Sequence, residues 1–150
     1  MPLSESERSF LSAARVGRLA TADAGGRPHV VPVCFALVDA AGGPTLVTPI
    51  DEKPKDAAPS ALRRVRDVEE NPPVALVADR YDEDWTRLGW VQVRGTAVVL
   101  DPPAVGHATG VEALRSKYDQ YADHALDERP LIRVALGSVR SWGRLTWPAD

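Results

Sequence analysis

The chain has 150 residues, close to the commonest size of a folded domain, so we expect a single domain over residues 1–150. Hydrophobic residues make up 44% of the chain and charged residues 26%, as in ordinary globular proteins. The formal net charge of -3 gives no general attraction to nucleic acid or to an anionic membrane, and we expect neither as a partner.

Cysteine content and the N-terminal residues indicate where the protein works. Cys34 is the only cysteine, which excludes an intrachain disulfide and a zinc site built from cysteines. Residues 1–7 are polar and acidic, whereas a signal peptide would be basic and then apolar. No apolar run approaches the roughly 20 residues of a membrane-spanning helix. We therefore expect a cytoplasmic protein.

The first third of the chain predicts a helix followed by a meander of strands. Ser4 and Glu7 form a capping box ahead of apolar residues at helical spacing, which predicts a helix that ends near Arg15. Runs of β-forming residues separated by glycine-rich turns then predict three strands, at residues 16–21, 29–38 and 44–50.

The predicted strand over residues 29–38 is apolar on both of its faces. A strand of this kind is buried on both sides, as in a barrel whose outer side is covered by a helix or by a second subunit. Pro32 lies inside it and has no N–H for a ladder hydrogen bond. We therefore expect a bulge or an unpaired edge at Pro32.

The remainder of the chain alternates strands with two helices. The pattern predicts a helix at residues 58–70 that ends before Pro72, and a second helix at 111–121. Strands are predicted at 74–79 and 90–100, followed by two β-like runs, 131–136 and 139–147, that Gly137 interrupts. About six strands with short helices favour a closed or split barrel over a parallel α/β sheet.

A basic loop follows the third predicted strand. Lys53 and Lys55 flank Pro54, which favours an extended loop, and the hydroxyl of Thr48 precedes them. Two ammonium groups and a hydroxyl could neutralise a phosphate, but surface lysines are common and the loop could simply be solvated. Arg63, Arg64 and Arg66 follow on the helix; Arg63 and Arg66 could equally pair with Asp67 and Glu70 at helical spacing.

The order of motifs resembles a known family. The segments that carry the resemblance are 18–33 (Arg-Leu-Ala-Thr, then Gly-Gly-Arg-Pro-His-Val-Val-Pro-Val), Thr48 with the two lysines, 66–73, and Arg140-Ser141-Trp142-Gly143. Together they resemble the pyridoxamine phosphate oxidase-like split barrels, which bind FMN or related flavins. They are most similar to the actinobacterial branch of F420-dependent oxidoreductases, and the resemblance covers nearly the whole chain.

The resemblance implies a mainly β split barrel of six to seven strands with about three helices. It also implies a homodimer with two cofactor sites at the subunit interface. Lys53 and Lys55 would hold the cofactor phosphate, Val31, Pro32 and Val33 would line its ring system, and Arg140 and Trp142 would approach from the partner chain. The acidic tail of F420 could lie along Arg63 and its neighbours.

Three functions remain open. The first is hydride transfer between the deazaflavin F420 and a small organic acceptor, which requires planar groups held close and water excluded rather than a nucleophile or a metal. The second is an FMN-dependent oxidase of the pyridoxamine phosphate type, and the third is a non-catalytic cofactor-binding protein. The histidines are isolated, so no metal site is expected, and the sequence does not identify a catalytic residue.

Overall fold

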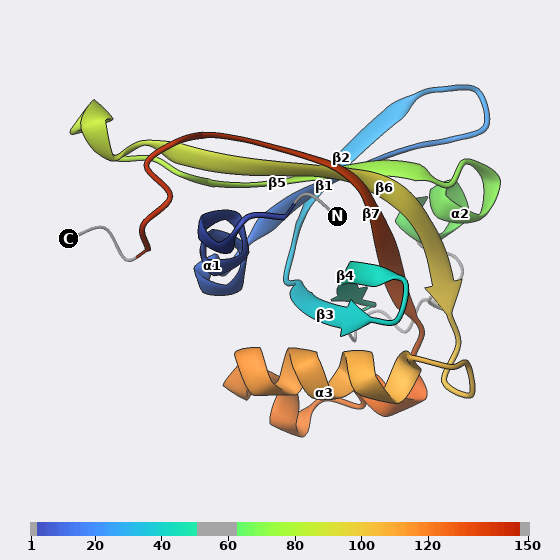
Figure 1. The fold of residues 1–150 in the computed structure, drawn as a ribbon. Coiled ribbons are helices and arrows are strands. Elements are labelled where there is room, and N and C mark those ends of the chain that lie inside the picture. The colour runs from blue at the N-terminus through green and yellow to red at the C-terminus, as the bar shows by residue number, and fades with distance from the viewer. Residues whose placement is uncertain (1–2, 51–62, 148–150) are drawn as a thin grey trace.

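The computed structural model describes residues 3–50 and 63–147. Within them the chain forms one antiparallel sheet, with three α-helices and short 3-10 turns around it (Figure 1). The helices are α1 (Glu5–Ala13), α2 (Arg63–Glu70) and α3 (His107–Lys117). The strands are β1 (Gly17–Ala22), β2 (Pro28–Val33), β3 (Ala36–Ala40), β4 (Gly43–Pro49), β5 (Pro73–Arg80), β6 (Gly89–Leu100) and β7 (Leu131–Gly143). The expected mainly β architecture is confirmed.

The order of the strands explains why the sheet is a split barrel. Neighbours in the sheet run β2-β1-β5-β6-β7-β4-β3, and every neighbouring pair is antiparallel. β2 and β3 are therefore opposite edges of the sheet, although only Cys34 and Phe35 separate them along the chain. Three Cα–Cα steps join Val33 to Ala36 and can span only about 11 Å, so the sheet must curl until its two edges approach each other.

The predicted strand over residues 29–38 is therefore wrong as one continuous element. The break at Phe35 is held by Tyr118, whose hydroxyl lies 3.1 Å from both the backbone N and the carbonyl O of Phe35. Thr48 donates a second hydrogen bond of 2.8 Å to the carbonyl of Cys34. Pro32 lies on the edge strand β2, as expected, where its missing N–H leaves no ladder bond unmade.

Two other boundaries differ from the prediction. The predicted helix at 111–121 is shifted: α3 begins at His107, after Gly106 in a left-handed conformation (φ 95°), and it ends at Lys117. A 3-10 helix over Asp119–Asp123 follows it. The two predicted β-like runs, 131–136 and 139–147, join in one strand, β7, which ends at Gly143. Gly137 is accommodated as a bulge between the pairs Gly95–Leu136 and Arg94–Ser138. The part of the 58–70 helix before Arg63 lies outside the described residues.

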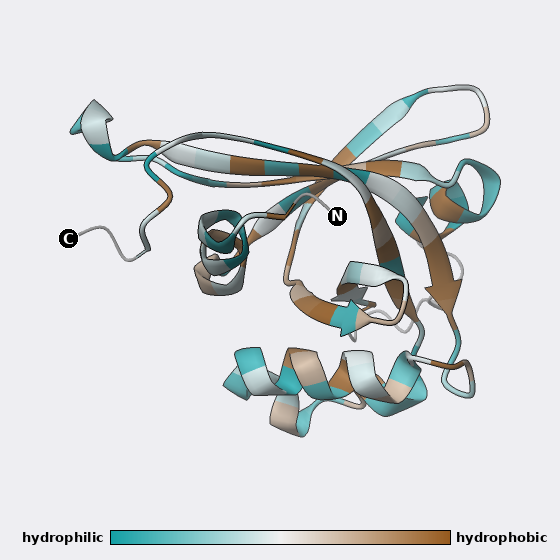
Figure 2. Cartoon of the chain, in the orientation of Figure 1, coloured by the Kyte–Doolittle hydropathy of each residue, from teal (hydrophilic) through white to brown (hydrophobic). Residues whose placement is uncertain are grey.

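The apolar core fills the space between the curled sheet and the helices. Phe10 and Leu11 of α1 pack with the inward residues of β5 and β6, including Leu76, Val91 and Val93. A second cluster joins α3 to β4 and β7. Figure 2 shows apolar residues concentrated along the strands, whereas hairpin tips and the outer turns of the helices are hydrophilic. No described helix is long and apolar enough to cross a membrane.

Candidate functional site

A pocket of about 270 Å³ lies at the split of the barrel. Its walls come from the end of β2, the end of β4 and the start of α2. The lining residues are Val31, Pro32, Val33, Cys34, Thr48, Pro49 and Arg64. Four of these, Val31, Pro32, Val33 and Thr48, are predicted site residues, so the fold brings together predicted residues of β2 and β4. The pocket combines an apolar wall with one cation.

Thr48 lines the pocket, and the cofactor contact expected of it stays a prediction. It is 2% exposed, and its hydroxyl hydrogen is directed to the carbonyl of Cys34. In this arrangement the hydroxyl hydrogen is used within the fold, and the lone pairs of the oxygen remain as acceptors. Thr48 therefore fixes the shape of the pocket, and Arg64 is the cation that the described part of the chain offers to an anion there.

Of the arginines proposed for the acidic tail, Arg63 lies outside the pocket and its helical neighbour Arg64 lines it. Arg63 instead donates to the carbonyl of Arg27 (3.3 Å) and pairs with the buried carboxylate of Asp67 (3.5 Å). The spacing of residues along α2 could have indicated this. Val65 and Val68 face the core, and Arg64, four residues before Val68, lies next to them on the helix surface. Arg63 lines a separate, charged hollow of about 230 Å³ with Asp23 and Glu70.

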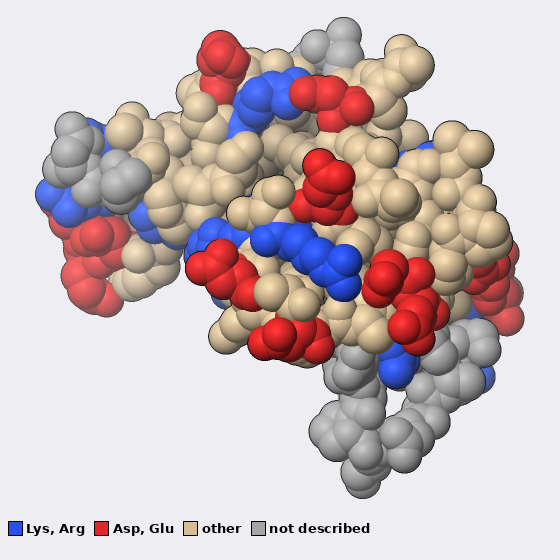
Figure 3. Space-filling model, turned by 90° about the horizontal axis from the view of Figure 1, so that it is seen from below, with Lys and Arg blue, Asp and Glu red and all other residues tan. Residues whose placement is uncertain are grey.

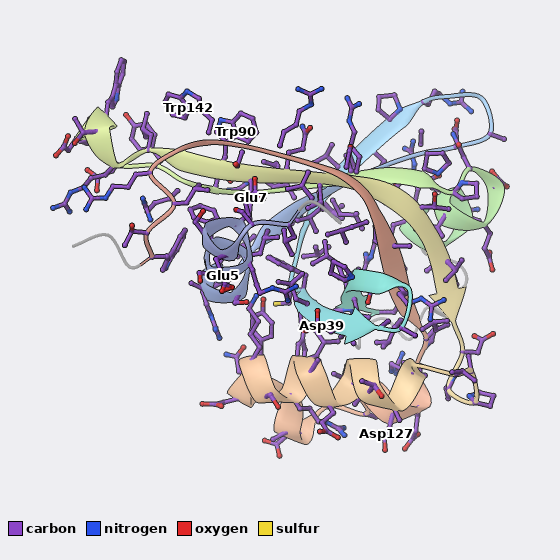
Figure 4. The ribbon with its side chains drawn as sticks, in the orientation of Figure 1. Glu5, Glu7, Asp39, Trp90, Asp127 and Trp142 are labelled. Carbon is purple, nitrogen blue, oxygen red and sulfur yellow. The ribbon has the colours of Figure 1, made fainter. Side chains whose placement is uncertain are left out.

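Arg140 and Trp142 lie on the outer face of the sheet. In the β6–β7 ladder Trp142 is opposite Trp90, and Arg140 is opposite Gln92. Figure 4 shows both tryptophans on the side of the sheet that faces away from α1 and α3. Trp142 is 54% exposed, and neither Arg140 nor Trp142 lines the pocket of its own chain. Any contact of these two side chains with a cofactor would need a second chain.

Lys53 and Lys55 lie outside the described residues, and so does the phosphate contact predicted for them. The described chain does show that Pro49 and Arg64, on either side of residues 51–62, border the same pocket. The described residues on both sides of the segment therefore lie beside the Val31–Val33 wall. The phosphate contact stays a prediction.

A larger hollow, of about 480 Å³, lies outside α3. Its polar side chains are used within the fold: Arg115 donates to the carbonyls of Tyr121 and His124, and the imidazole Nε2 of His107 lies 2.6 Å from the carbonyl of Arg129. Figure 3, which views the molecule from this side, shows acidic and basic side chains interspersed. Among the residues described, no cluster of three potential metal ligands occurs.

Comparison with known proteins identifies the family. The family model for pyridoxamine 5'-phosphate oxidase matches residues 3–143, nearly the whole chain. The chain belongs to the pyridoxamine 5'-phosphate oxidase family. A relative from Streptomyces rimosus is 32% identical over 146 residues, covering 95% of this chain and 84% of its own. That relative is named 5a,11a-dehydrotetracycline/5a,11a-dehydrooxytetracycline reductase.

Solved structures of other proteins share the fold at low sequence identity. The heme storage protein HutZ from Vibrio cholerae superposes with a TM-score of 0.67 at 17% identity and covers 95% of both chains. A conserved hypothetical protein from Mycobacterium tuberculosis has a TM-score of 0.68 at 22% identity, over 93% of this chain and 84% of the other. These likenesses establish the split barrel and leave the ligand to be argued from the site.

Proposed function

We propose that this protein is an oxidoreductase that transfers a hydride between the deazaflavin coenzyme F420 and a small organic acceptor. The observation that supports the proposal best is the pocket at the barrel split, with its apolar Val31–Val33 wall and the Arg64 guanidinium beside it. A flat, largely apolar ring system with an anionic substituent has the shape and charge that such a pocket accommodates. The 32% identical relative is named as a reductase, which supports the redox chemistry.

We propose further that the site is completed by a second copy of the chain. The pocket's 270 Å³ is below the roughly 300–1,000 Å³ of most ligand sites, so the described residues of one chain supply only part of the enclosure. The outer face of the sheet leaves Val30 59% and Trp142 54% exposed, as expected for a surface that a partner covers. A homodimer through this face would also bring Arg140 and Trp142 toward a cofactor bound by the partner.

The chemistry that the site must perform is limited. When bound, the reduced deazaflavin supplies a hydride, and the chain's own residues position the acceptor and exclude water. Val31, Pro32 and Val33 provide the apolar wall, while Arg64 neutralises negative charge. The name of the relative indicates reduction of a dehydrotetracycline, so we propose a conjugated carbon–carbon double bond as the acceptor group.

A cofactor titration tests the proposal. Purified protein is titrated with F420, with FMN and with heme, and the same titrations are made on Arg64→Ala, Lys53→Ala and Lys55→Ala. Removing one charge-assisted contact should weaken F420 binding by roughly tenfold to a hundredfold. Arg27→Ala is the matched control, because Arg27 is exposed on the β1–β2 hairpin and does not line the pocket.

Each other outcome points to an alternative. Preferential FMN binding would favour the flavin oxidase, and binding of heme alone would contradict the deazaflavin proposal. Tight F420 binding without oxidation of F420H2 by conjugated acceptors would favour a cofactor-binding protein. Selective F420 binding followed by acceptor-dependent loss of F420H2 absorbance is the result that we expect.

A further inference from the structure

A hollow of about 420 Å³ lies between the end of α1, the start of β3 and the end of α3. Its polar side chains are Ser12, Arg15, Ser116 and Lys117, and three apolar residues of β3 and α3 complete the lining. None of these residues lines the pocket at the barrel split. The hollow is therefore separate from the candidate cofactor site.

Lys117 brings to this hollow a group that is rare in the chain. The sequence contains three lysines and 15 arginines, and Lys117 is the only lysine among the residues that the structure describes. An arginine stays protonated in proteins, whereas a lysine loses its proton when its surroundings disfavour the charge. Only the uncharged amine has a lone pair with which to form a bond. Lys117 is thus the described side-chain amine that can act as a nucleophile.

The surroundings of Lys117 favour the uncharged amine. Its Nζ lies 4.0 Å from the centre of the buried Phe35 ring and donates to the carbonyl of Leu11 at 3.1 Å. Among the described residues no carboxylate forms an ion pair with it. The titratable and charged side chains that face it are Arg15, Cys34 and Tyr118.

Burial, and then the positive charge of Arg15, lower the pKa of Lys117 from 10.5 to about 8. At pH 8 roughly half of Lys117 is therefore free amine, whereas a lysine with an ordinary pKa would be less than about 1% deprotonated. The fold thus maintains, at the edge of a solvent-filled hollow, an amine that is ready to react near neutral pH.

Carbon dioxide is an electrophile that matches this amine and the cation beside it. The nitrogen lone pair attacks the carbon of CO2, an N–C bond forms, and one C=O π bond becomes the negative charge of a carboxylate. One proton passes from the nitrogen to water, and neither an oxidant nor a leaving group is needed. The product is a carbamate, which keeps one N–H for the carbonyl of Leu11. Its carboxylate lies at an angle of about 120° to that N–H and so points away from the carbonyl.

We propose that Lys117 binds carbon dioxide as a carbamate in this hollow, with Arg15 as the counter-ion and the hydroxyls of Ser12 and Ser116 as hydrogen-bond donors. Carbamate formation replaces two neighbouring positive charges by an ion pair, which is the change that the Arg15 guanidinium favours. Acylation of the amine would give a neutral amide and leave Arg15 without a counter-ion. The site requires no cofactor, so the inference goes beyond the proposed function and does not depend on it.

Chemical trapping tests the carbamate directly. Protein equilibrated at pH 8 with ¹³C-labelled bicarbonate and CO2 is treated with triethyloxonium, which converts a carbamate into a stable ethyl carbamate. Peptide mass spectrometry should locate the label on Lys117. The trapped fraction should fall by roughly tenfold or more in guanidinium chloride, because the unfolded chain restores the ordinary pKa of the amine. An unlabelled Lys117, or equal labelling of folded and unfolded protein, would overturn the proposal.

Arg15→Met and Arg8→Met are a matched pair that tests the counter-ion. Arg15→Met removes the cation that lines the hollow, and the trapped fraction at Lys117 should fall by about twofold to fivefold. Arg8 pairs with Asp39 at 3.1 Å and does not line the hollow, so Arg8→Met should leave the trapped fraction unchanged. Equal trapping in the two variants would show that Arg15 is not the counter-ion.

Thermal unfolding provides a second measurement. A ligand that binds only the folded chain raises its Tm. At pH 8 and constant ionic strength, bicarbonate and CO2 should raise the Tm of the native protein and leave that of Lys117→Arg unchanged. A rise in Tm without a trapped label would mean that bicarbonate is held non-covalently, and it would overturn the carbamate. Neither measurement uses F420, so failure of the cofactor proposal and failure of this one are distinguishable.

Discussion

Lys117 and Arg15 join the ends of two helices by reciprocal hydrogen bonds. Lys117 Nζ donates to the carbonyl of Leu11 in the last turn of α1 (3.1 Å), and Arg15 Nη2 donates to the carbonyl of Lys117 at the end of α3 (2.9 Å). Carbonyls at helix C-termini lack helical partners, and the helix dipole favours cations there. Burial, and then the nearby Arg15 charge, lower the pKa of Lys117 to about 8.

This perturbed lysine predicts a pH-dependent difference in stability between the native protein and Lys117→Met. Between about pH 8 and its ordinary pKa of 10.5, the folded state binds fewer protons at Lys117 than the unfolded state does. The free energy of unfolding should therefore rise with pH in that window, relative to the variant, and the difference should be constant below it. Urea unfolding at pH 7, 8, 9 and 10 measures the effect.

The unfolding measurements stop at pH 10 because the neighbouring Tyr118 begins to titrate in the unfolded state above that pH. Burial raises the pKa of Tyr118 to about 12, so at higher pH its ionisation in the unfolded state opposes folding. Lys117→Arg keeps a cation at this position that does not titrate, and it serves as the control. Parallel curves for the native protein and both variants would show that Lys117 keeps an ordinary pKa.

At the scale of elements, β6 and β7 form the longest ladder of the sheet, and a bulge lies in its middle. Leu136 is opposite Gly95 and Ser138 is opposite Arg94, so Gly137 has no partner residue. The chain approaches Gly95 closely at this point: a Cβ there would overlap the carbonyl O of Ala135 and lie 2.8 Å from Cγ1 of Val134. Glycine is required by the close approach of the backbone.

Gly95→Ala should therefore destabilise the protein. The added methyl group has to displace backbone in the centre of the sheet, which costs about 1–3 kcal/mol. Thr96→Ala, at the adjacent exposed position of the same strand, should change stability by less than about 1 kcal/mol. Chemical denaturation of both variants measures the difference. Equal stability of the two would mean that β7 moves away from β6 at little cost.

At the scale of the whole molecule, the outer sheet face should decide the oligomeric state. Val30 is 59% exposed on this face, on the edge strand β2. A charge there should not disturb a single folded chain, but it would be buried without a partner in a dimer formed through this face. Val30→Glu should therefore give a monomer of 16.2 kDa by light scattering, whereas the native protein should give twice that mass.

Val105→Glu is the matched control, since Val105 is 92% exposed and lies between β6 and α3, away from the outer face of the sheet. Its mass in solution should equal that of the native protein. A native protein that is monomeric at micromolar concentration would remove the proposed interface site. A Val30→Glu dimer would move the interface to another face.

Local sequence patterns were sufficient to predict most of the helices and strands. The Ser4–Glu7 capping box is formed as predicted, and the alternation in β6 buries Val91, Val93 and Ala97 as predicted. These features depend on neighbours a few residues apart, whose spacing the sequence states directly. The family resemblance predicted the split barrel, and it predicted that Val31, Pro32 and Val33 line the site.

Tertiary structure alone decided the features that depend on distant residues. The break at Phe35 exists because Tyr118, 83 residues later, bonds its backbone, and no local pattern encodes that partner. Arg64 lines the pocket and Arg63 does not, because the packing of α2 against the sheet determines which side of the helix faces the pocket. The sequence by itself determined which segments become strands and helices, since propensity and periodicity are local. Only the curled sheet determined which of them meet at the site, because packing and register join residues that are far apart in the chain.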